Sequence, residues 1–346
     1  LAAINEARER VYLSTYIFEA NTVGRRFVEA LAAARERGLD VRVLLDGVGE
    51  WTQLPLAGTL LKRRGVPLAR FLPPRLIPPS VHLNLRCHRK ILVADGRVGF
   101  TGGMNIGDRY LAGRKWRKTR VTDTHFRLRG PIVAQMEEVF LWDWGFATGQ
   151  DTAPPAGPPP APAGDSVCRA VVDGPSEDLD RLVDVYCAAI GAARERIRIM
   201  TPYFLPPREL VAAFHLAVKR GVEISIILPA TNDQAVVHWA AQHMLPDILD
   251  LGARVYFQPP PFAHTKHLMV DQGYAVLGSA NLDPRSLRLN FELGLEVFDP
   301  GLTKILIAHF EKIRHGSREL TAEALAGRSL PLRLRDAACW LFSPYL

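Results

Sequence analysis

The sequence contains few cysteines, and they are scattered. Four occur in 346 residues, with no C-x-x-C pair and no Cys/His cluster at metal-ligand spacing. This excludes the pattern of a disulfide-stabilised secreted domain and gives no zinc signature. We therefore expect a reducing compartment and no metal or other cofactor.

Long hydrophobic runs are absent as well. No apolar stretch reaches the roughly 18 residues that suggest a transmembrane helix, and no signal peptide is visible. The chain begins at Leu1 rather than at a methionine. Removal of an N-terminal leader or membrane anchor therefore stays open.

Lysine is scarce, with 8 residues against 35 arginines. The net charge is nevertheless +7 and the pI near 9.4, which favours polyanionic partners such as nucleic acid or an anionic membrane surface. Hydrophobic residues make up 48% of the chain and charged residues 23%, as in globular proteins. The length suggests two domains of ordinary size.

Two of the few lysines belong to a motif that occurs twice. Each copy reads H-x-K-x-x-x-x-D, then a turn, then G-[GS]-x-N, with identical spacing. The members are His88, Lys90, Asp95 and Asn105 in the first copy and His264, Lys266, Asp271 and Asn281 in the second. Duplication of one ancestral half explains the shared register.

The surrounding pattern of elements is duplicated too. Apolar, β-branched stretches at Val11–Phe18 and Val41–Leu45 predict buried strands, with a helix over Val23–Arg37 between them. The same order recurs in the second half, at Ile197–Phe204, Arg208–Arg220 and Val222–Leu228. This predicts an α/β fold in which each half has a mostly parallel or mixed sheet flanked by helices.

A proline-rich segment separates the halves. Residues 151–166 cannot pack a core and are typical of a stiff linker. We expect one domain over residues 1–150 and a second over 167–346, related by a pseudo-twofold axis.

The motif chemistry follows from strand geometry. Side chains two apart on a strand share a face, so each His and its Lys project together. Asp95 and Asp271 have the opposite parity and lie beside a turn, which predicts a structural or orienting role. Asn105 and Asn281 follow a returning strand and can rejoin the His/Lys face.

Two such motifs meeting at one point suit a phosphodiester. Ammonium and amide groups would hold the non-bridging oxygens, while one imidazole attacks phosphorus and the other protonates the leaving oxygen. No metal is needed for this chemistry. A carboxylate follows each motif, and we expect Asp123 to orient the histidine of the first motif and Glu292 that of the second; the alternative for both is an ordinary strand-end carboxylate.

Substrate contacts are also predicted. Tyr16 and Tyr203 occupy similar places before the first helix of each half, and Arg86 and Arg89 belong to a basic segment from Arg63 to Lys90. This segment is either a solvated loop or an electrostatic surface for a phosphate-bearing substrate.

At this point the sequence resembles the phospholipase D superfamily, and within it bacterial cardiolipin synthases. The resemblance is carried by the duplicated motif and by the segments Y-I-F-E-A-N, V-R-V-L-L-D-G-V-G, G-G-M-N-I-G-D-R-Y, T-P-Y-F-L-P, G-S-A-N-L-D-P-R-S-L, L-N-F-E-L and F-S-P-Y-L. It implies two phospholipase D-like domains and phosphatidyl transfer through a phosphohistidine. His88 would be the nucleophile and His264 the acid that releases glycerol from phosphatidylglycerol, after which a second phospholipid accepts the phosphatidyl group.

The resemblance also implies partners and a location. We expect anionic phospholipid substrates, peripheral binding to the cytoplasmic side of a bacterial inner membrane, and no specific nucleic acid. Arg109 stands where the family usually has an acidic residue, and the segment Gly113 to Thr122 is unusually basic, so the acceptor lipid stays open. The last fourteen residues contain Trp340, Leu341, Phe342 and Tyr345, which would suit a bilayer interface or a helix docked on its own domain.

Other functions remain possible on the same residues. Water in place of the acceptor gives a phospholipase D hydrolase, and a nucleic-acid substrate gives a nuclease or other phosphodiesterase. A third possibility is a non-catalytic scaffold that binds anionic lipid. The sequence leaves the oligomeric state undetermined.

Overall fold

The computed structural model describes all residues except 53, 77–78, 81–83, 112–119, 156 and 177. The chain divides into two compact units, each completed by a short segment from the other half of the sequence. The N-unit comprises Leu1–Lys115, Thr124–Asp165 and Asn290–Leu293, and the C-unit comprises Trp116–Asp123, Ser166–Leu289 and Gly294–Leu346.

The N-unit is built on a six-stranded mixed sheet in the order β3-β2-β1-β6-β7-β9. Its strands are β1 (Arg10–Thr15), β2 (Asp40–Asp46), β3 (Leu68–Phe71), β6 (Ile91–Ala94), β7 (Val98–Gly102) and β9 (His125–Arg129). The first three pair in parallel and the others antiparallel. Its other elements are α1 (Ala2–Glu6), α2 (Thr22–Glu36), η1 (Gly49–Thr52), α3 (Ala57–Arg63), the hairpin β4 (Arg75–Leu76) with β5 (Pro79–Ser80), η2 (Asp108–Tyr110) and α4 (Ile132–Thr148).

Local sequence explains the first β-α-β unit. The side chain of Asn21 accepts a hydrogen bond from the Gly24 amide and caps the start of α2. The chain leaves the helix through Gly38, whose φ of +88° favours glycine. Val11, Leu31 and other side chains of this unit are fully buried in one core, so apolar burial, about 25 cal/mol per Å², stabilises helix and strands together.

The C-unit contains an eight-stranded sheet in the order β10-β17-β16-β15-β11-β12-β13-β18. Its strands are β10 (Val167–Asp173), β11 (Arg196–Met200), β12 (Glu223–Pro229), β13 (Arg254–Gln258), β15 (His267–Val270), β16 (Tyr274–Gly278), β17 (Glu292–Phe298) and β18 (Arg318–Glu319), and a separate parallel pair joins β8 (Val121–Thr122) to β14 (Phe262–Ala263). Its helices are α5 (Arg181–Ala192), α6 (Arg208–Lys219), α7 (Ala235–Asp250), η3 (Arg285–Leu289), α8 (Pro300–His315), α9 (Ala322–Ala326), α10 (Leu330–Trp340) and η4 (Ser343–Tyr345).

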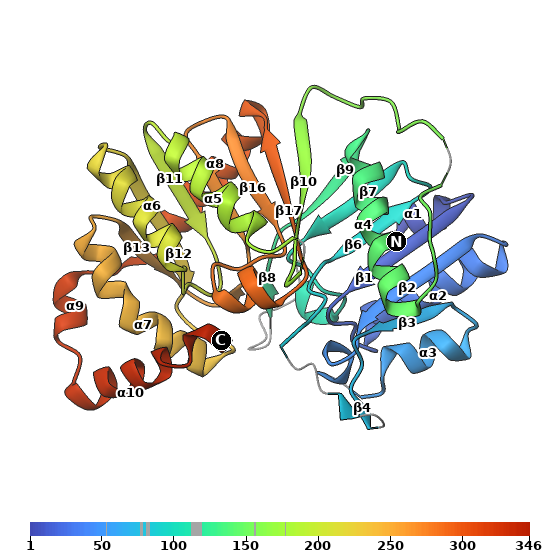
Figure 1. Cartoon of the computed structure of the whole chain (residues 1–346), viewed down its shortest axis with the longest axis horizontal. Helices are drawn as coiled ribbons and strands as arrows, with labels where there is room; N and C mark the ends of the chain where they lie inside the picture. The colour runs from blue at the N-terminus through green and yellow to red at the C-terminus, as the bar shows by residue number, and fades with distance from the viewer. Residues whose placement is uncertain (53, 77–78, 81–83, 112–119, 156, 177) are drawn as a thin grey trace. The chain divides into compact units, whose positions relative to one another are not determined.

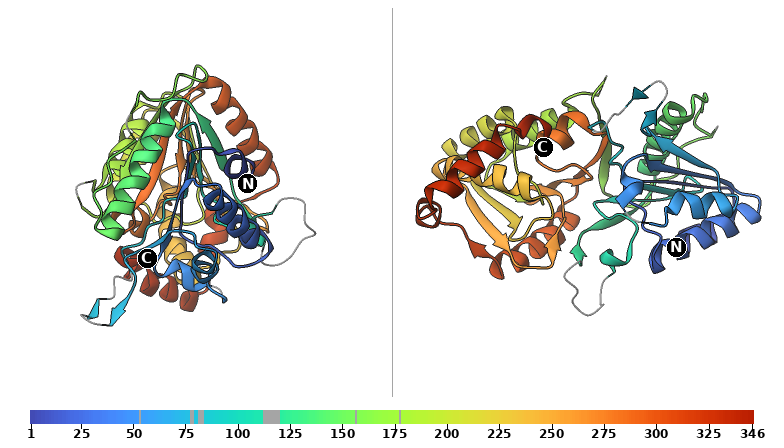
Figure 2. Two further views of the ribbon diagram at one scale, coloured as in Figure 1. Left: turned by 90° about the vertical axis from the view of Figure 1, so that its right-hand side faces the viewer. Right: turned by 90° about the horizontal axis from the view of Figure 1, so that it is seen from below.

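The two sheets share one topology. The order β3-β2-β1-β6-β7-β9 recurs in the C-unit as β13-β12-β11-β15-β16-β17. Each sheet is flanked by helices, as α5, α6 and α8 illustrate beside the strands of the C-unit (Figures 1 and 2). The prediction of two α/β halves is confirmed, and the sheets are mixed rather than mostly parallel because the strands that carry the motifs run antiparallel to β1 and β11.

The segment between the halves carries no helix or strand among its described residues, 151–155 and 157–166. It follows α4, which ends at Gly149, and precedes β10. The predicted domain boundaries fall here and stay a prediction; the compact units depart from them by exchanging residues 116–123 and 290–293.

Candidate active site

In the N-unit, residues 86–88 and 290–292 lie side by side. The amide of His88 donates to the carbonyl of Phe291 at 2.9 Å, and the amide of Phe291 donates to the carbonyl of Arg86 at 2.8 Å. His88 itself precedes β6, whose Ile91 pairs with Ser14 near the end of β1. These backbone bonds fix the histidine at the edge of the sheet where β1 ends.

The His88 imidazole contacts a buried carboxylate. Nδ1 lies 2.9 Å from Oε1 and 3.0 Å from Oε2 of Glu292, whose side chain is fully buried. A carboxylate only accepts, so Nδ1 carries the proton in this contact and the lone pair is on Nε2. Asn290 donates its amide to Oε1 of Glu292 at 3.1 Å and so holds the carboxylate in place.

Lys90 of the first motif and Tyr16 lie beside this pair. Lys90 is buried and donates from Nζ to the carbonyl of His88 at 2.6 Å, and its ammonium lies 5.7 Å from the centre of the Tyr16 ring. Tyr16 meets the His88 ring edge-on at 5.2 Å. Asn105 accepts the amide of Ile17, the residue after Tyr16. We call His88, Lys90, Asn105, Glu292 and Tyr16 the first histidine cluster.

The C-unit contains a second cluster of the same kind. The pairing of β8 with β14 leads into His264, whose amide donates to the carbonyl of Thr122 at 2.8 Å. Nδ1 of His264 lies 2.8 Å from Oδ2 of Asp123, whose side chain is fully buried. Tyr203 meets the His264 ring edge-on at 6.4 Å.

Lys266 lies closer to its histidine ring. Its ammonium donates to the carbonyl of His264 at 2.6 Å and also lies 2.9 Å from Nδ1. One nitrogen cannot both donate to a carboxylate and accept from an ammonium, so we assign the proton to the His264–Asp123 contact and treat the lysine as an electrostatic neighbour. Asn281 donates to Oγ of Ser286 at 3.0 Å. His264 contacts Asp123, Lys266 and Tyr203, and together with Asn281 of the same motif these residues are called the second histidine cluster.

The expected pairing of carboxylates with histidines is wrong. Asp123 follows the first motif but binds His264, and Glu292 follows the second but binds His88. The physical reason is the segment exchange, because residues 116–123 belong to the C-unit and 290–293 to the N-unit. Unequal spacing was the one hint in the sequence: the carboxylates follow their motifs by 35 and 28 residues, whereas the other motif members share one spacing.

Asp95 and Asp271 act on the backbone. Asp95 accepts the amides of Arg8, Glu9 and Arg10, at the end of β1 remote from His88. Asp271 accepts those of Arg194, Glu195 and Arg196 in the same way. Burial alone would raise the pKa of each carboxyl, but the three amides lower it below its usual value. Of the two roles that the sequence predicts for these aspartates, structural or orienting, these contacts correspond to the structural one.

The predicted substrate contacts of Arg86 and Arg89 are contradicted. Both side chains are buried, and they form ion pairs with Asp46 and Asp143. Their charges are therefore neutralised inside the N-unit. Cys87 lies between them with its thiol beside Asp143, and burial raises the pKa of that thiol well above its usual value.

Other arginines of the basic segment also form ion pairs within the N-unit. Arg64 pairs with Glu29 on α2, and Arg70 pairs with the buried Glu50. The side chain of Arg75 and the stretch 112–119, which holds most of the second basic segment, lie outside the described residues. Arg109 forms an ion pair with Glu19, a buried residue next to the Asn21 cap. The described arginines thus mostly stabilise the fold.

Sequence reasoning missed two positioning side chains. Asn290 holds Glu292, and the hydroxyl of Tyr110 accepts a hydrogen bond from the Asn105 amide at 3.0 Å. Both residues stand in segments that carry the family resemblance, L-N-F-E-L and G-G-M-N-I-G-D-R-Y. The sequence alone does not predict these two contacts, since each contact depends on how its segment packs in the fold.

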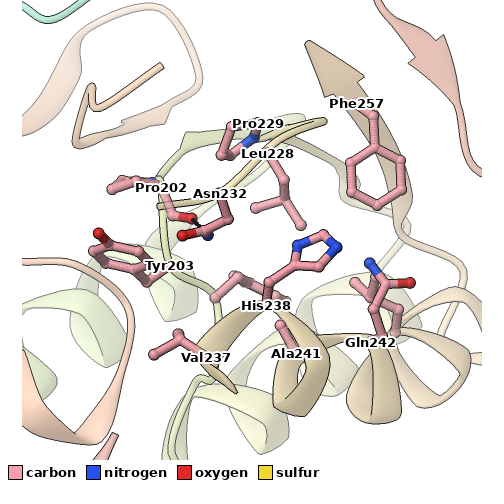
Figure 3. Close-up of a pocket in the computed structure, with 12 residues that line it drawn as sticks. Pro202, Tyr203, Leu228, Pro229, Asn232, Val237, His238, Ala241, Gln242 and Phe257 are labelled. Atoms are coloured by element: carbon pink, nitrogen blue, oxygen red, sulfur yellow. Dashed lines mark hydrogen bonds between the residues drawn. The ribbon is translucent and has the colours of Figure 1, made fainter. Parts of the chain in front are cut away.

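A pocket adjoins the second cluster. It encloses about 280 Å³, including space open to solvent, between the loops that follow β11 and β12 and helix α7. Figure 3 shows Tyr203, Asn232, Val237 and His238 around it. Burial lowers the pKa of His238, which favours its neutral form.

The described residues include no group of three His, Cys, Asp or Glu side chains placed to hold a metal ion. Within the same residues, no helix is long and apolar enough to cross a membrane. Each cluster supplies an imidazole with its tautomer set by a carboxylate, an ammonium and an amide. That combination can attack, protonate and neutralise a phosphoryl group.

Comparison with known proteins agrees with this chemistry. Residues 1–144 and 186–314 match the family described as "Cardiolipin synthase, PLD-like domain". The major cardiolipin synthase ClsA of Bacillus subtilis (strain 168) is 34% identical over 100% of this chain and 72% of its own length, and a cardiolipin synthase of Geobacillus sp. (strain WCH70) is 32% identical over 99% and 69%. A crystal structure of phosphatidylserine synthase from Haemophilus influenzae Rd KW20 superposes with a TM-score of 0.78 at 18% identity, covering 100% of this chain and 92% of that one.

Proposed function

This chain belongs to the family of cardiolipin synthase, PLD-like domains, and on that premise we propose that it is a phosphatidyltransferase that makes cardiolipin. It transfers a phosphatidyl group from phosphatidylglycerol to a hydroxyl of a second phospholipid, with phosphatidylglycerol as the expected acceptor, and releases glycerol. The observation that supports this most directly is the pair of equivalent His–carboxylate contacts, one in each unit.

In the first step, His88 acts as the nucleophile. The lone pair on Nε2 attacks phosphorus and forms a P–N bond while the P–O bond to glycerol breaks. The imidazole gains positive charge as this happens, and Glu292 stabilises it through Nδ1–H. His264, protonated on Nε2, gives its proton to the departing glycerol oxygen.

In the second step, His264 acts as the base. It takes the proton from the acceptor hydroxyl, whose oxygen attacks the phosphohistidine, and the P–N bond breaks to restore neutral His88. Lys90, Lys266, Asn105 and Asn281 neutralise the non-bridging oxygens in both steps. The residues Tyr16 and Tyr203, whose rings meet the two histidines edge-on, contact the substrate.

The different surroundings of the two histidines support His88 as the nucleophile and His264 as the proton donor. Glu292 presents both oxygens to His88 and is held by Asn290, which suits a ring that must carry positive charge through the intermediate. The ammonium of Lys266 lies 2.9 Å from Nδ1 of His264 and opposes positive charge on that ring, which suits a proton donor.

The test is product analysis with the full chain and phosphatidylglycerol vesicles. We expect cardiolipin and glycerol by mass spectrometry, a phosphoryl group trapped by acid on His88, and loss of both with His88→Ala. Phosphatidic acid as the main product would identify a hydrolase, and cleavage of single-stranded DNA without lipid turnover a nuclease. Full biological activity in His88→Ala and His264→Ala variants would identify a scaffold.

The membrane location is part of the proposal. The substrates of the proposed reaction lie in a bilayer, so the active site must meet a membrane surface. We propose peripheral binding to the cytoplasmic face of the inner membrane. The net charge of +7 favours binding to anionic lipid there.

A further inference from the structure

The outer side of α10 and the turn after it expose large apolar side chains. Leu330, Leu334 and Ala338 follow one another at intervals of four along the helix, which places them on one face. Leu341 and Tyr345 continue the exposure beyond the helix end. Leu330, Leu334, Leu341 and Tyr345 are between 61% and 72% exposed.

The opposite side of α10 is firmly attached to the C-unit. Trp340 and Cys339 pack with Leu205 and with Ala240 and Ala241 of α7, and the two helices lie side by side in Figure 1. The leucines are therefore displayed by a helix whose inner face is satisfied, and their exposure is not a consequence of a loose end.

Buried charges fix the helix rotation as well. Asp336 is 1% exposed and forms ion pairs with Arg328 and Arg335, and the Arg335 guanidinium lies 4.3 Å from the centre of the Trp239 ring on α7. Rotating α10 to bury its leucines would break the pair between Asp336 and Arg328, which precedes the helix, and would move Arg335 off the Trp239 ring. These contacts keep the apolar face turned outward, where it is available to a partner.

The charge of this segment indicates the partner. Arg328 and Arg335 pair with Asp336, and Arg333, exposed between Leu332 and Leu334, adds a positive charge beside the leucines. Alternation of leucine with arginine, together with exposed Phe342 and Tyr345, is typical of a helix that lies in the interface of an anionic bilayer. A protein partner with an apolar groove would not need the basic side chains among the leucines.

The same surface is connected to the second histidine cluster. The carbonyl of Leu346 accepts the amide of Arg285 at 3.1 Å, and Ser286, the next residue of η3, accepts the amide of Asn281. The pocket in Figure 3 lies against α7, the helix on which α10 packs, and Tyr203 lines it while facing His264. If α10 lies in a bilayer, its position relative to the bilayer surface therefore also fixes the position of the second histidine cluster.

We propose that the face formed by Leu330, Leu334, Leu341, Phe342 and Tyr345 docks on an anionic lipid bilayer and holds the second histidine cluster at the level of the phospholipid headgroups. This inference rests on the proposed function only in that the bilayer contains the substrate. Docking itself requires no turnover.

The experiment measures binding and turnover separately. Binding of the full chain to vesicles of phosphatidylcholine with phosphatidylserine is followed by flotation, and turnover is measured on a short-chain phosphatidylglycerol that stays monomeric in water. The double variant Leu334→Ser/Leu341→Ser is expected to bind vesicles at least about tenfold more weakly, because each lost leucine removes apolar area from the interface. Its turnover of the soluble substrate is expected to equal that of the wild type, which also shows that it folds.

The matched control is Leu216→Ser/Ile305→Ser, which removes two equally exposed apolar side chains from α6 and α8 of the same unit. It is expected to bind vesicles as the wild type does. Arg333→Gln should weaken binding and reduce its dependence on salt. Binding by His88→Ala should be unchanged.

Two results would overturn the docking proposal. One is equal vesicle binding by the wild type and the Leu334→Ser/Leu341→Ser variant; the other is a change of oligomeric state in that variant with vesicle binding retained, which would assign the face to a second copy of the chain. If the wild type docks but turns over no phosphatidylglycerol, the docking proposal stands and the proposed function fails.

Discussion

Nδ1 of His88 lies 2.9 Å from Oε1 of Glu292, a residue 204 positions later in the chain. The corresponding contact of His264 reaches back 141 positions to Asp123. Each imidazole therefore depends on a carboxylate that the sequence supplies from the far side of the proline-rich segment. The proposed chemistry makes this dependence measurable.

Glu292→Gln should slow formation of the phosphohistidine by about 10–100-fold, because the amide cannot stabilise the charged imidazole as a carboxylate does. The measurement is acid-quenched labelling from phosphatidylglycerol on a millisecond-to-second scale. Glu296→Gln is the matched control, since it alters another buried carboxylate of β17 that binds Tyr274 and Arg169 instead. Equal labelling rates in the two variants would remove Glu292 from the mechanism.

The crossed pairing predicts which variants behave alike. In a phosphatidyl ester of p-nitrophenol, the leaving group departs as p-nitrophenolate and needs no proton from a general acid. The variants Asp123→Asn and His264→Ala should therefore still release one equivalent of nitrophenolate in a burst. His88→Ala and Glu292→Gln should show no burst or a much slower one. Release of nitrophenol followed by stopped flow checks this. A missing burst in Asp123→Asn with a normal one in Glu292→Gln would support the uncrossed pairing.

Arg86→Met should destabilise the protein and leave substrate affinity alone. It leaves Asp46 buried without its cation, which costs about 3–5 kcal/mol of unfolding free energy. Urea unfolding and the KM of the folded variant are the measurements, with the exposed Arg63→Met as the control. A raised KM with unchanged stability would return Arg86 to substrate binding.

Asp95→Asn should lower stability near pH 7 and matter less in acid. The folded pKa of Asp95 lies below its unfolded value, so its contribution is complete above the unfolded pKa of about 3.9 and is lost as the pH falls through the folded pKa. We expect a loss of about 2 kcal/mol at neutral pH, from weaker bonds to three amides. The unfolding midpoints of the wild type and the variant should begin to converge as the pH falls below about 4; a constant gap at lower pH would contradict this prediction.

Much of the fold was predictable from local pattern. The strand β1, the helix α2 and the strand β2 lie within a few residues of their predicted ranges, because apolar periodicity, an N-cap and a glycine stop act over short distances. The sequence correctly separated His88 and Lys90 from Asp95, although all three lie outside the predicted strand, which the structure limits to Ile91–Ala94. These features need no knowledge of which strands become neighbours.

The site was less predictable wherever it depended on neighbours. The sequence identified Asp123 and Glu292 as carboxylates of interest but paired them with the wrong histidines, since nothing local records that a segment crosses to the other unit. Arg86 and Arg89 looked like a basic surface because their partners, Asp46 and Asp143, lie 40 and 54 residues away. Long-range partners decide whether a charge is offered to a substrate or used inside the fold.

The exchange of residues 116–123 and 290–293 also determines which His–carboxylate pair can form first during synthesis of the chain. His88 is made early, but its carboxylate emerges only after residue 292 has been translated, about 10–40 s later at the usual 5–20 residues per second. His264 meets a carboxylate that is already present. The proposed nucleophile is thus the last of the two histidines to be completed, so a nascent chain, or one truncated before residue 292, carries no finished nucleophile.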